Sequence, residues 1–322
     1  MNRRGPGKAH RSGITLMQLI QKFPDDATAE TWFVHARWPE GIICPHCDSS
    51  NVNPNAKHPS MPYRCRERNC RKRFSIKTGT VMECSNLGYQ IWAIAIFLIA
   101  TNLKGISSMK LHRDLGVTQK TAWFLAHRIR ETWKINDSSC LKWLPGFPGP
   151  IEVDETYIGG KRKNMSHEKR KELTGRGSVG KVAVAGVKDR TTGQVSARVV
   201  QGTDSVTLQG FVRHHAVPGT TVYTDEARAY QGMTDLDHHT VNHSVGEYVN
   251  DMAHTNGIES FWSMLKRGYQ GIFHKISPKH LDRYVSEFAG RHNARLRDTI
   301  DIMVSMVARM VGKRVKYHEL VA

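Results

Sequence analysis

Residues 151–158 read Ile-Glu-Val-Asp-Glu-Thr-Tyr-Ile, and apolar side chains alternate with polar ones at the start of this stretch. Such alternation predicts a β-strand with one face in a protein core. Asp154 lies within this strand, Asp225 directly follows the β-rich run 220–224, and Glu259 opens a helical pattern. Oxygen ligands from separate segments are what Mg²⁺ or Mn²⁺ accepts, so the three acids indicate a metal-dependent site for phosphoryl transfer.

The pattern around this strand predicts an α/β domain. We expect strands at 151–158, 181–187 and 194–200, a helix at 205–215, strands at 220–224 and 239–243, and a helix from near Thr255. This is the element order of a ribonuclease H-like fold, with Asp154 on the first strand and Asp225 at the end of the fourth. Glu155 and Glu226 directly follow the two aspartates and should point to the opposite faces, so we do not expect them to be metal ligands.

The helix that carries Glu259 offers a competing ligand. Asn256 lies three residues before Glu259 and on a neighbouring face, where its amide can support Glu259 or act as a weak neutral ligand. Lys266 lies two helical turns after Glu259 and is placed to touch a DNA phosphate; the alternative is a solvated surface lysine. Trp262 and Leu265 favour core packing.

Four cysteines form two close pairs, Cys44 with Cys47 and Cys65 with Cys70. Two such pairs predict a zinc ribbon with four thiolates around one Zn²⁺; His46 or His58 could replace a cysteine, and unligated thiols are the alternative. We expect Cys84 and Cys140, which lie outside the pattern, to be ordinary buried cysteines. The basic residues beside the second pair would give the ribbon a basic surface: Arg64, Arg66, Arg68, Arg71, Lys72 and Arg73.

Residues 107–123 resemble a helix-turn-helix, in which Gly116 supplies the turn and Thr118 caps the second helix. Core positions in the second helix recur at helical spacing: Ala122, Ala126, Ile129 and Trp133. Four other side chains are expected to face phosphates or base edges: Lys120, His127, Arg128 and Arg130. The alternative is a helical hairpin with a solvated basic face.

The composition indicates a polyanionic partner. The 322 residues include 47 Lys plus Arg against 29 Asp plus Glu, a formal charge of +18 and a pI near 9.8. The longest apolar run, 91–100, is too short to span a membrane, and a cytoplasmic, nucleoid-associated protein is expected. The patterns predict a helical lead at 1–40, a zinc ribbon at 41–82, a helix-turn-helix-like region at 83–145, a catalytic domain at 146–275 and C-terminal helices at 276–322.

Several motifs in one order resemble a known family. Behind the cysteine pairs come residues 153–161 (Val-Asp-Glu-Thr-Tyr-Ile-Gly-Gly-Lys), 223–226, 254–268 and 279–288. Together they are similar to bacterial insertion-sequence transposases of the Merlin-related group, within the acidic-triad (DDE) transposases and integrases. The likeness spans about residues 38–297.

The resemblance implies a DNA transposase that cleaves strands and transfers them with Mg²⁺ or Mn²⁺. Asp154 and Asp225 carry over as the first two ligands, and either Glu259 or Asn256 as the third, because some members have asparagine there. Lys266 and Arg267 would contact DNA. Partners would be the element's terminal repeats and target DNA, and joining two ends implies a homo-oligomer. A ribonuclease H-like nuclease without strand joining and a non-catalytic zinc-ribbon regulator are the alternatives.

Overall fold

The computed structural model describes residues 13–134, 146–147, 149–160, 162–173, 178–241 and 254–322. Within these ranges the chain divides into two compact units, one from residues before 134 together with 294–322, and one from 134–293. The C-terminal residues, expected to form one region, therefore divide between the units at residue 294.

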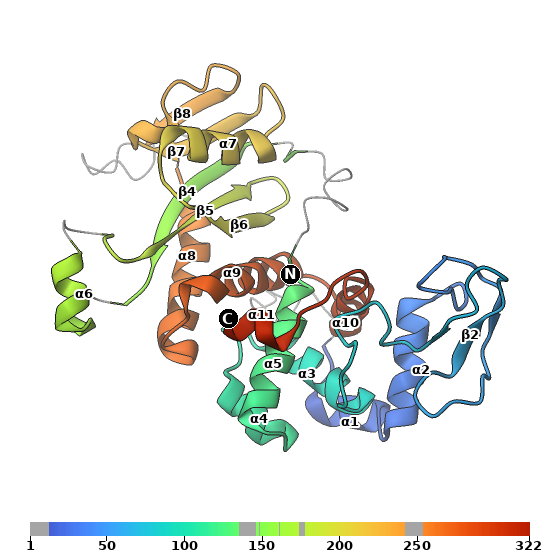
Figure 1. Cartoon of the computed structure of the whole chain (residues 1–322). Helices are drawn as coiled ribbons and strands as arrows, with labels where there is room; N and C mark the ends of the chain where they lie inside the picture. The colour runs from blue at the N-terminus through green and yellow to red at the C-terminus, as the bar shows by residue number, and fades with distance from the viewer. Residues whose placement is uncertain (1–12, 135–145, 148, 161, 174–177, 242–253) are drawn as a thin grey trace, which may run out of the picture. The chain divides into compact units, whose positions relative to one another are not determined.

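A mixed sheet of five strands forms the centre of the second unit, as far as the structure describes it, in the order β6-β5-β4-β7-β8 (Figure 1). The central strand β4 (Ile151–Ile158) pairs antiparallel with β5 (Val182–Asp189), which pairs antiparallel with β6 (Val195–Val199). On its other side β4 pairs parallel with β7 (Thr221–Asp225), and β7 with β8 (Asp237–Val241). The predicted order of strands along the chain is confirmed; of the fifth predicted strand, residues 242 and 243 lie outside the described residues.

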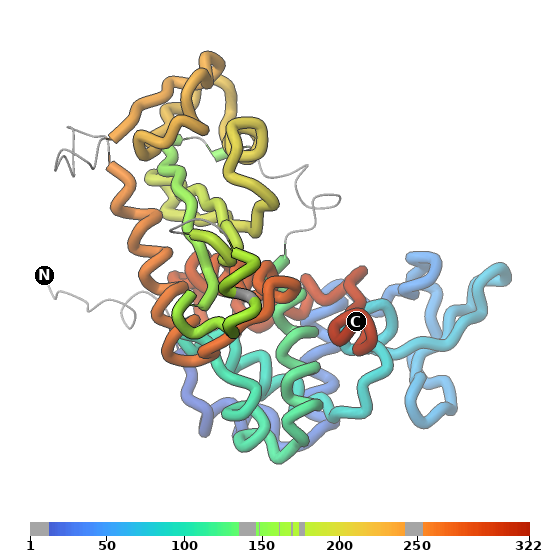
Figure 2. The backbone as a smooth tube through the Cα atoms, turned by 60° about the vertical axis from the view of Figure 1, so that its left-hand side comes forward, coloured from blue at the N-terminus to red at the C-terminus, as the bar shows by residue number. Residues whose placement is uncertain are grey.

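Helices cover both faces of this sheet. Ile151, Val153 and their neighbours pack with α7 (Ser205–His215) in one buried cluster. Val184 and Ile158 pack in a second cluster with α8 (Asn256–Gly268) and α9 (Pro278–Asn293). Odd-numbered residues of β4 thus enter the first core, and α8 runs beside β4 on the second face, as the two views show (Figures 1 and 2).

Local sequence sets the ends of α7. Asp204 accepts a hydrogen bond from the backbone N–H of Thr207, which satisfies an amide in the first turn. The helix occupies the predicted range 205–215. Short elements complete the described part of the unit: η2 (Arg162–Asn164), α6 (His167–Glu172), η3 (Arg228–Tyr230) and the π-helix η5 (Tyr269–Phe273).

The first unit is mainly helical. Its helices are α1 (Leu16–Lys22), α2 (Asp26–Arg37), α3 (Tyr89–Thr101), α4 (Ser108–Leu115), α5 (Gln119–Glu131), α10 (Thr299–Ala308) and α11 (Tyr317–Val321). A small antiparallel sheet follows α2, with strands β1 (Val52–Asn53), β2 (Tyr63–Cys65) and β3 (Arg73–Phe74). Trp92 of α3 is fully buried in the core that joins the helices to this sheet.

The turn between α4 and α5 has the expected construction. Gly116 ends α4 in the left-handed conformation with φ 64°, which glycine adopts without a Cβ clash. Thr118 accepts a hydrogen bond from the N–H of Thr121 and caps α5. In the described parts of the chain, no helix combines the length and the apolar character needed to cross a membrane.

Candidate active site

The central strand β4 brings Asp154 to the face that α8 covers. Glu152 and Asp154 share that face, because Glu152 accepts a hydrogen bond from the N–H of Ile258 and Asp154 accepts one from the indole of Trp262, both on α8. Glu155 points the other way and accepts a hydrogen bond from Tyr230. The alternation therefore separates Asp154 from its acidic neighbour, as expected.

Asp225 lies at the end of the adjacent parallel strand. The register pairs Ile151 with Val222 and Glu152 with Tyr223, so two residues further on Asp154 and Asp225 reach the same level of the sheet. Asp225 also accepts a hydrogen bond from the backbone N–H of Ala227, 3.1 Å away, which turns the chain after the strand. The two aspartates thus occupy neighbouring positions on parallel strands.

Burial and nearby charge act on the carboxyl group of Asp154. Desolvation, followed by the charges of Glu155 and Asp225, raises its pKa to about 7, against the lowering effect of two hydrogen bonds. Burial and Asp225 also raise the pKa of Glu155. A divalent cation beside Asp154 would offset the nearby negative charges of Glu155 and Asp225 and would therefore be electrostatically favoured there.

Trp262 of α8 forms a hydrogen bond with Asp154. Its indole N–H donates to Asp154 Oδ2 at 3.0 Å. The ring lies over Gly186, the residue paired with Asp154 on β5, and a Cβ at Gly186 would come within 2.6 Å of the indole. The absence of a side chain at Gly186 therefore gives the indole room beside the strand. Trp262 packs in the core, as predicted, and also binds Asp154, which the sequence did not indicate.

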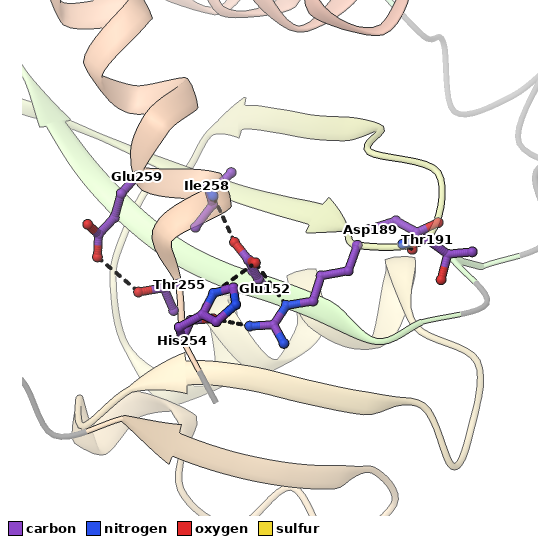
Figure 3. Close-up of polar contacts among 8 residues, drawn as sticks. Glu152, Asp189, Thr191, His254, Thr255, Ile258 and Glu259 are labelled. Carbon is purple, nitrogen blue, oxygen red and sulfur yellow. Dashed lines mark hydrogen bonds and ion pairs between the residues drawn. The ribbon is translucent and has the colours of Figure 1, made fainter. Parts of the chain in front are cut away.

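Glu259 and Asn256 are both exposed near the start of α8. Glu259 accepts a hydrogen bond from Thr255 Oγ1 at 3.0 Å (Figure 3). Ile258 lies against Glu152 and Trp262 against Asp154, so Glu259 lies between these levels along the helix, whereas Asn256 precedes both. In the described parts of the chain, carboxylates do not form a ligand group within 4.8 Å; only the four cysteines do.

Lys266 and Arg267 occupy the last turn of α8 and are both exposed. Lys266 lies seven residues after Glu259, which is nearly two full turns and hence on the same side of the helix. Arg267 donates from Nε to the backbone oxygen of Ser263. Both side chains remain accessible to a polyanion.

The four predicted zinc ligands come together in the first unit, with Cys65 on β2 and the other three outside the strands of the small sheet. Cys44 Sγ lies 3.7 Å from Cys70 Sγ, Cys47 Sγ lies 3.6 Å from Cys65 Sγ, and all four sulfurs are within 4.8 Å of one another. Zn–S bonds of about 2.3 Å place tetrahedral sulfurs about 3.8 Å apart, so the geometry fits Zn²⁺. His58 instead accepts backbone N–H groups of its own loop. Burial raises the pKa of Cys65 to about 12, which means that forming its thiolate is unfavourable without a cation. A bound cation would stabilise the thiolate.

Residues 147–293 match the family model of the ISXO2-like transposase domain. This part of the chain therefore resembles a transposase domain of that family. The match contains β4 to β8 and α7 to α9, and therefore Asp154, Asp225 and Glu259. A curated relative from Halobacterium salinarum, described as an uncharacterized protein in transposable element ISH50, is 28% identical over 284 residues, covering 84% of this chain and 92% of the relative.

Outside the matched region, three of the four side chains of α5 that were expected to face DNA are buried. His127 is fully buried, and Arg128 and Arg130 are 7% and 2% exposed. Arg128 donates to the backbone oxygen of Glu83, and Arg130 to that of Ile106. Arg128 and Arg130 therefore bind backbone groups inside the first unit. Lys120 is exposed, and its Nζ lies 4.5 Å from the ring centre of Tyr317.

Two charged residues in the matched region, Glu152 and Arg190, were not predicted from the sequence. Glu152 is 2% exposed and forms an ion pair with Arg190, whose side chain is 12% exposed. A glutamate at a core-facing position of a strand was the available signal, because a buried carboxylate needs a partner. Nothing in the linear pattern identified Arg190, which lies beyond the end of β5.

Proposed function

We propose that the chain is a DNA transposase that binds the ends of its own element and catalyses metal-dependent strand cleavage followed by strand transfer. The observation that carries this proposal is the parallel register of β4 and β7, which aligns Asp154 with Asp225 inside a transposase domain. The strand order, with three antiparallel strands followed by two parallel ones, supports a ribonuclease H-like fold.

In this proposal Asp154 and Asp225 hold Mg²⁺ or Mn²⁺, with Glu259 as third carboxylate. A bound divalent cation supplies Lewis acidity and neutralises the charge that develops on the scissile phosphate. Trp262 orients Asp154 through its indole N–H. Lys266, two turns beyond Glu259, positions a DNA phosphate beside the acids.

DNA ends would first be bound through the exposed basic residues of the first unit. All six basic residues beside the second cysteine pair are exposed, as is Lys120 at the start of α5. Contacts of this kind are to phosphates and lose affinity as salt rises. In the transposase domain Lys266 and Arg267 would add contacts near the acids. Since two element ends must be joined, we infer that the chain acts as a homo-oligomer.

The proposal is tested by incubating the full-length protein and Mg²⁺ with DNA that carries the ends of its own element, together with a supercoiled target. We expect nicked ends and covalent end–target joints with the wild type, and neither with Asp225→Asn, which should still bind the ends. Cleavage without joints would identify the chain as a nuclease of the same chemistry. End binding with no cleavage under any divalent cation would identify it as a non-catalytic regulator.

The third ligand is decided by comparing Glu259→Gln with Asn256→Ala. A carboxylate adds a full charge against two cations, whereas an amide adds a dipole. If Glu259 is the ligand, Glu259→Gln should remove cleavage as fully as Asp154→Asn does. Asn256→Ala should reduce cleavage by about 10- to 100-fold, which is typical for a group that only supports a ligand. The reverse ranking would assign the role to Asn256.

A further inference from the structure

Glu152 is a buried carboxylate with no role in the chemistry proposed above. It lies two residues before Asp154, on the same face of β4. It accepts a hydrogen bond from the N–H of Ile258 at 2.9 Å and forms an ion pair with Arg190, whose Nε lies 2.8 Å from Glu152 Oε1. His254 Nδ1 lies 3.4 Å from the same oxygen (Figure 3). The carboxylate is therefore committed to protein partners and is not available as a metal ligand.

One of these partners is the beginning of α8. Thr255, the residue before the helix, makes no side-chain capping bond and instead donates its hydroxyl to Glu259. Glu152 on β4 instead accepts a hydrogen bond from the first turn of α8, and its negative charge lies at the positive end of the α8 dipole. The start of the helix that carries Glu259 is therefore attached to β4 through Glu152.

Arg190 links this contact between β4 and α8 to β7, the strand that carries Asp225. Its guanidinium donates to the backbone oxygen of His254 and lies 4.0 Å from the ring centre of Tyr223. Tyr223 is on β7, two residues before Asp225. Glu152, Tyr223 and Ile258 thus lie one or two residues from Asp154, Asp225 and Glu259 respectively, and Arg190 with Glu152 contacts all three segments.

We propose that Glu152 and Arg190 are a positioning pair that sets the spacing of the three acidic elements and thereby the affinity of the site for divalent cations. The proposal rests on the proposed metal-dependent function. Buried ion pairs add little net stability compared with apolar packing, so a role in fixing geometry suits this pair better than a role in stability. The lack of a side chain at Gly257 leaves room for the carboxylate of Glu152, because a Cβ there would lie 2.6 Å from both Glu152 Oε2 and Lys188 Nζ.

The test compares Glu152→Gln with Glu287→Gln in the full-length, zinc-loaded protein. Glu287 is also fully buried, and it pairs with Arg291 in α9 of the same unit. We measure Mn²⁺ binding by electron paramagnetic resonance and subtract the binding that persists in Asp154→Asn. Glu152→Gln should weaken Asp154-dependent binding about 10- to 100-fold, with cleavage largely restored at saturating Mn²⁺. Glu287→Gln should lower the melting temperature without changing Mn²⁺ affinity.

A glycine pair tests the same inference while keeping both charged residues. Gly257→Ala should displace the carboxylate of Glu152, which is the flexible end of its side chain, and weaken Mn²⁺ binding at little cost in stability. Gly210→Ala in α7, where a Cβ would meet nothing within 4 Å, should leave Mn²⁺ affinity unchanged. Gly257→Ala decides the question if Glu152→Gln fails to fold.

The outcomes separate this inference from the proposed function. A folded wild type without Asp154-dependent Mn²⁺ binding would contradict the proposed function itself. Wild-type Mn²⁺ affinity in folded Glu152→Gln, or in Gly257→Ala, would overturn the positioning pair while leaving the metal site in place.

Discussion

At the scale of single residues, Asp154 is held in a state that opposes its own ionisation. Its carboxyl group is partly buried, lies near Glu155 and Asp225, and has a pKa of about 7 without a cation. The indole of Trp262 offsets part of this effect by donating to the charged form. A proton and a divalent cation should therefore compete for Asp154 near neutral pH.

This competition predicts a pH-dependent gain in stability for Asp154→Asn. The folded-state pKa, about 7, exceeds the model-compound value of 3.8, so the folded protein binds the proton more tightly than the unfolded chain does. The wild type should therefore lose stability as pH rises from about 4 to about 7. The variant lacks this titration and should unfold with a free energy higher by a few kcal/mol at about pH 8 in Mg²⁺-free buffer. Urea unfolding at about pH 4 and 8 measures the difference; equal stability at pH 8 would contradict the pKa.

At the scale of elements, α4, its turn and α5 show what sequence can and cannot predict. Gly116 and Thr118 were assigned correctly, because turn and capping geometry depend on residues a few positions apart. The basic residues of α5 were expected to be exposed, but Arg128 and Arg130 reach carbonyl groups 45 and 24 residues away in the chain. Such partners are set by tertiary packing, which helical periodicity does not encode.

The ribbon gives a prediction at the same scale. Cys44, Cys65, Trp38 and Phe74 belong to one buried cluster, so the sulfur site and the aromatic core should be coupled. We expect about one zinc per chain by elemental analysis. Cys47→Ser should lose the zinc, change the fluorescence of Trp38 and weaken binding to element ends, because the metal contributes on the order of 10 kcal/mol to folding of such sites.

Cys84→Ser is the matched control for the ribbon. Cys84 was expected to be buried but is exposed, and it lies outside the sulfur cluster. The Cys84→Ser variant should keep one zinc per chain and bind element ends normally. Loss of zinc from Cys84→Ser, or normal end binding by zinc-free Cys47→Ser, would contradict the assignment.

At the scale of the whole molecule, the order of strands and helices along the chain of the second unit was predictable from the sequence. Alternation predicted that Asp154 and Glu155 point to opposite faces of β4, and the element order put Asp225 at the end of β7 and Glu259 on α8. The pairing of Glu152 with Arg190 was not predictable, since it joins residues 38 positions apart whose neighbours give no common pattern. The division of the chain at residue 294 was missed for a similar reason, because α10 packs against α2 and α3 from the opposite end of the sequence.

Asp154 and Asp225 are proposed to hold a divalent cation for DNA strand chemistry, and a change of the ligand atom at Asp225 tests this role. Thiolate is a poor ligand for Mg²⁺ and a better one for Mn²⁺. Strand transfer by Asp225→Cys should therefore be lost in Mg²⁺ and recovered in Mn²⁺, whereas Asp225→Ser should be inactive in both. Full activity of Asp225→Cys in Mg²⁺ would show that Asp225 does not bind the cation.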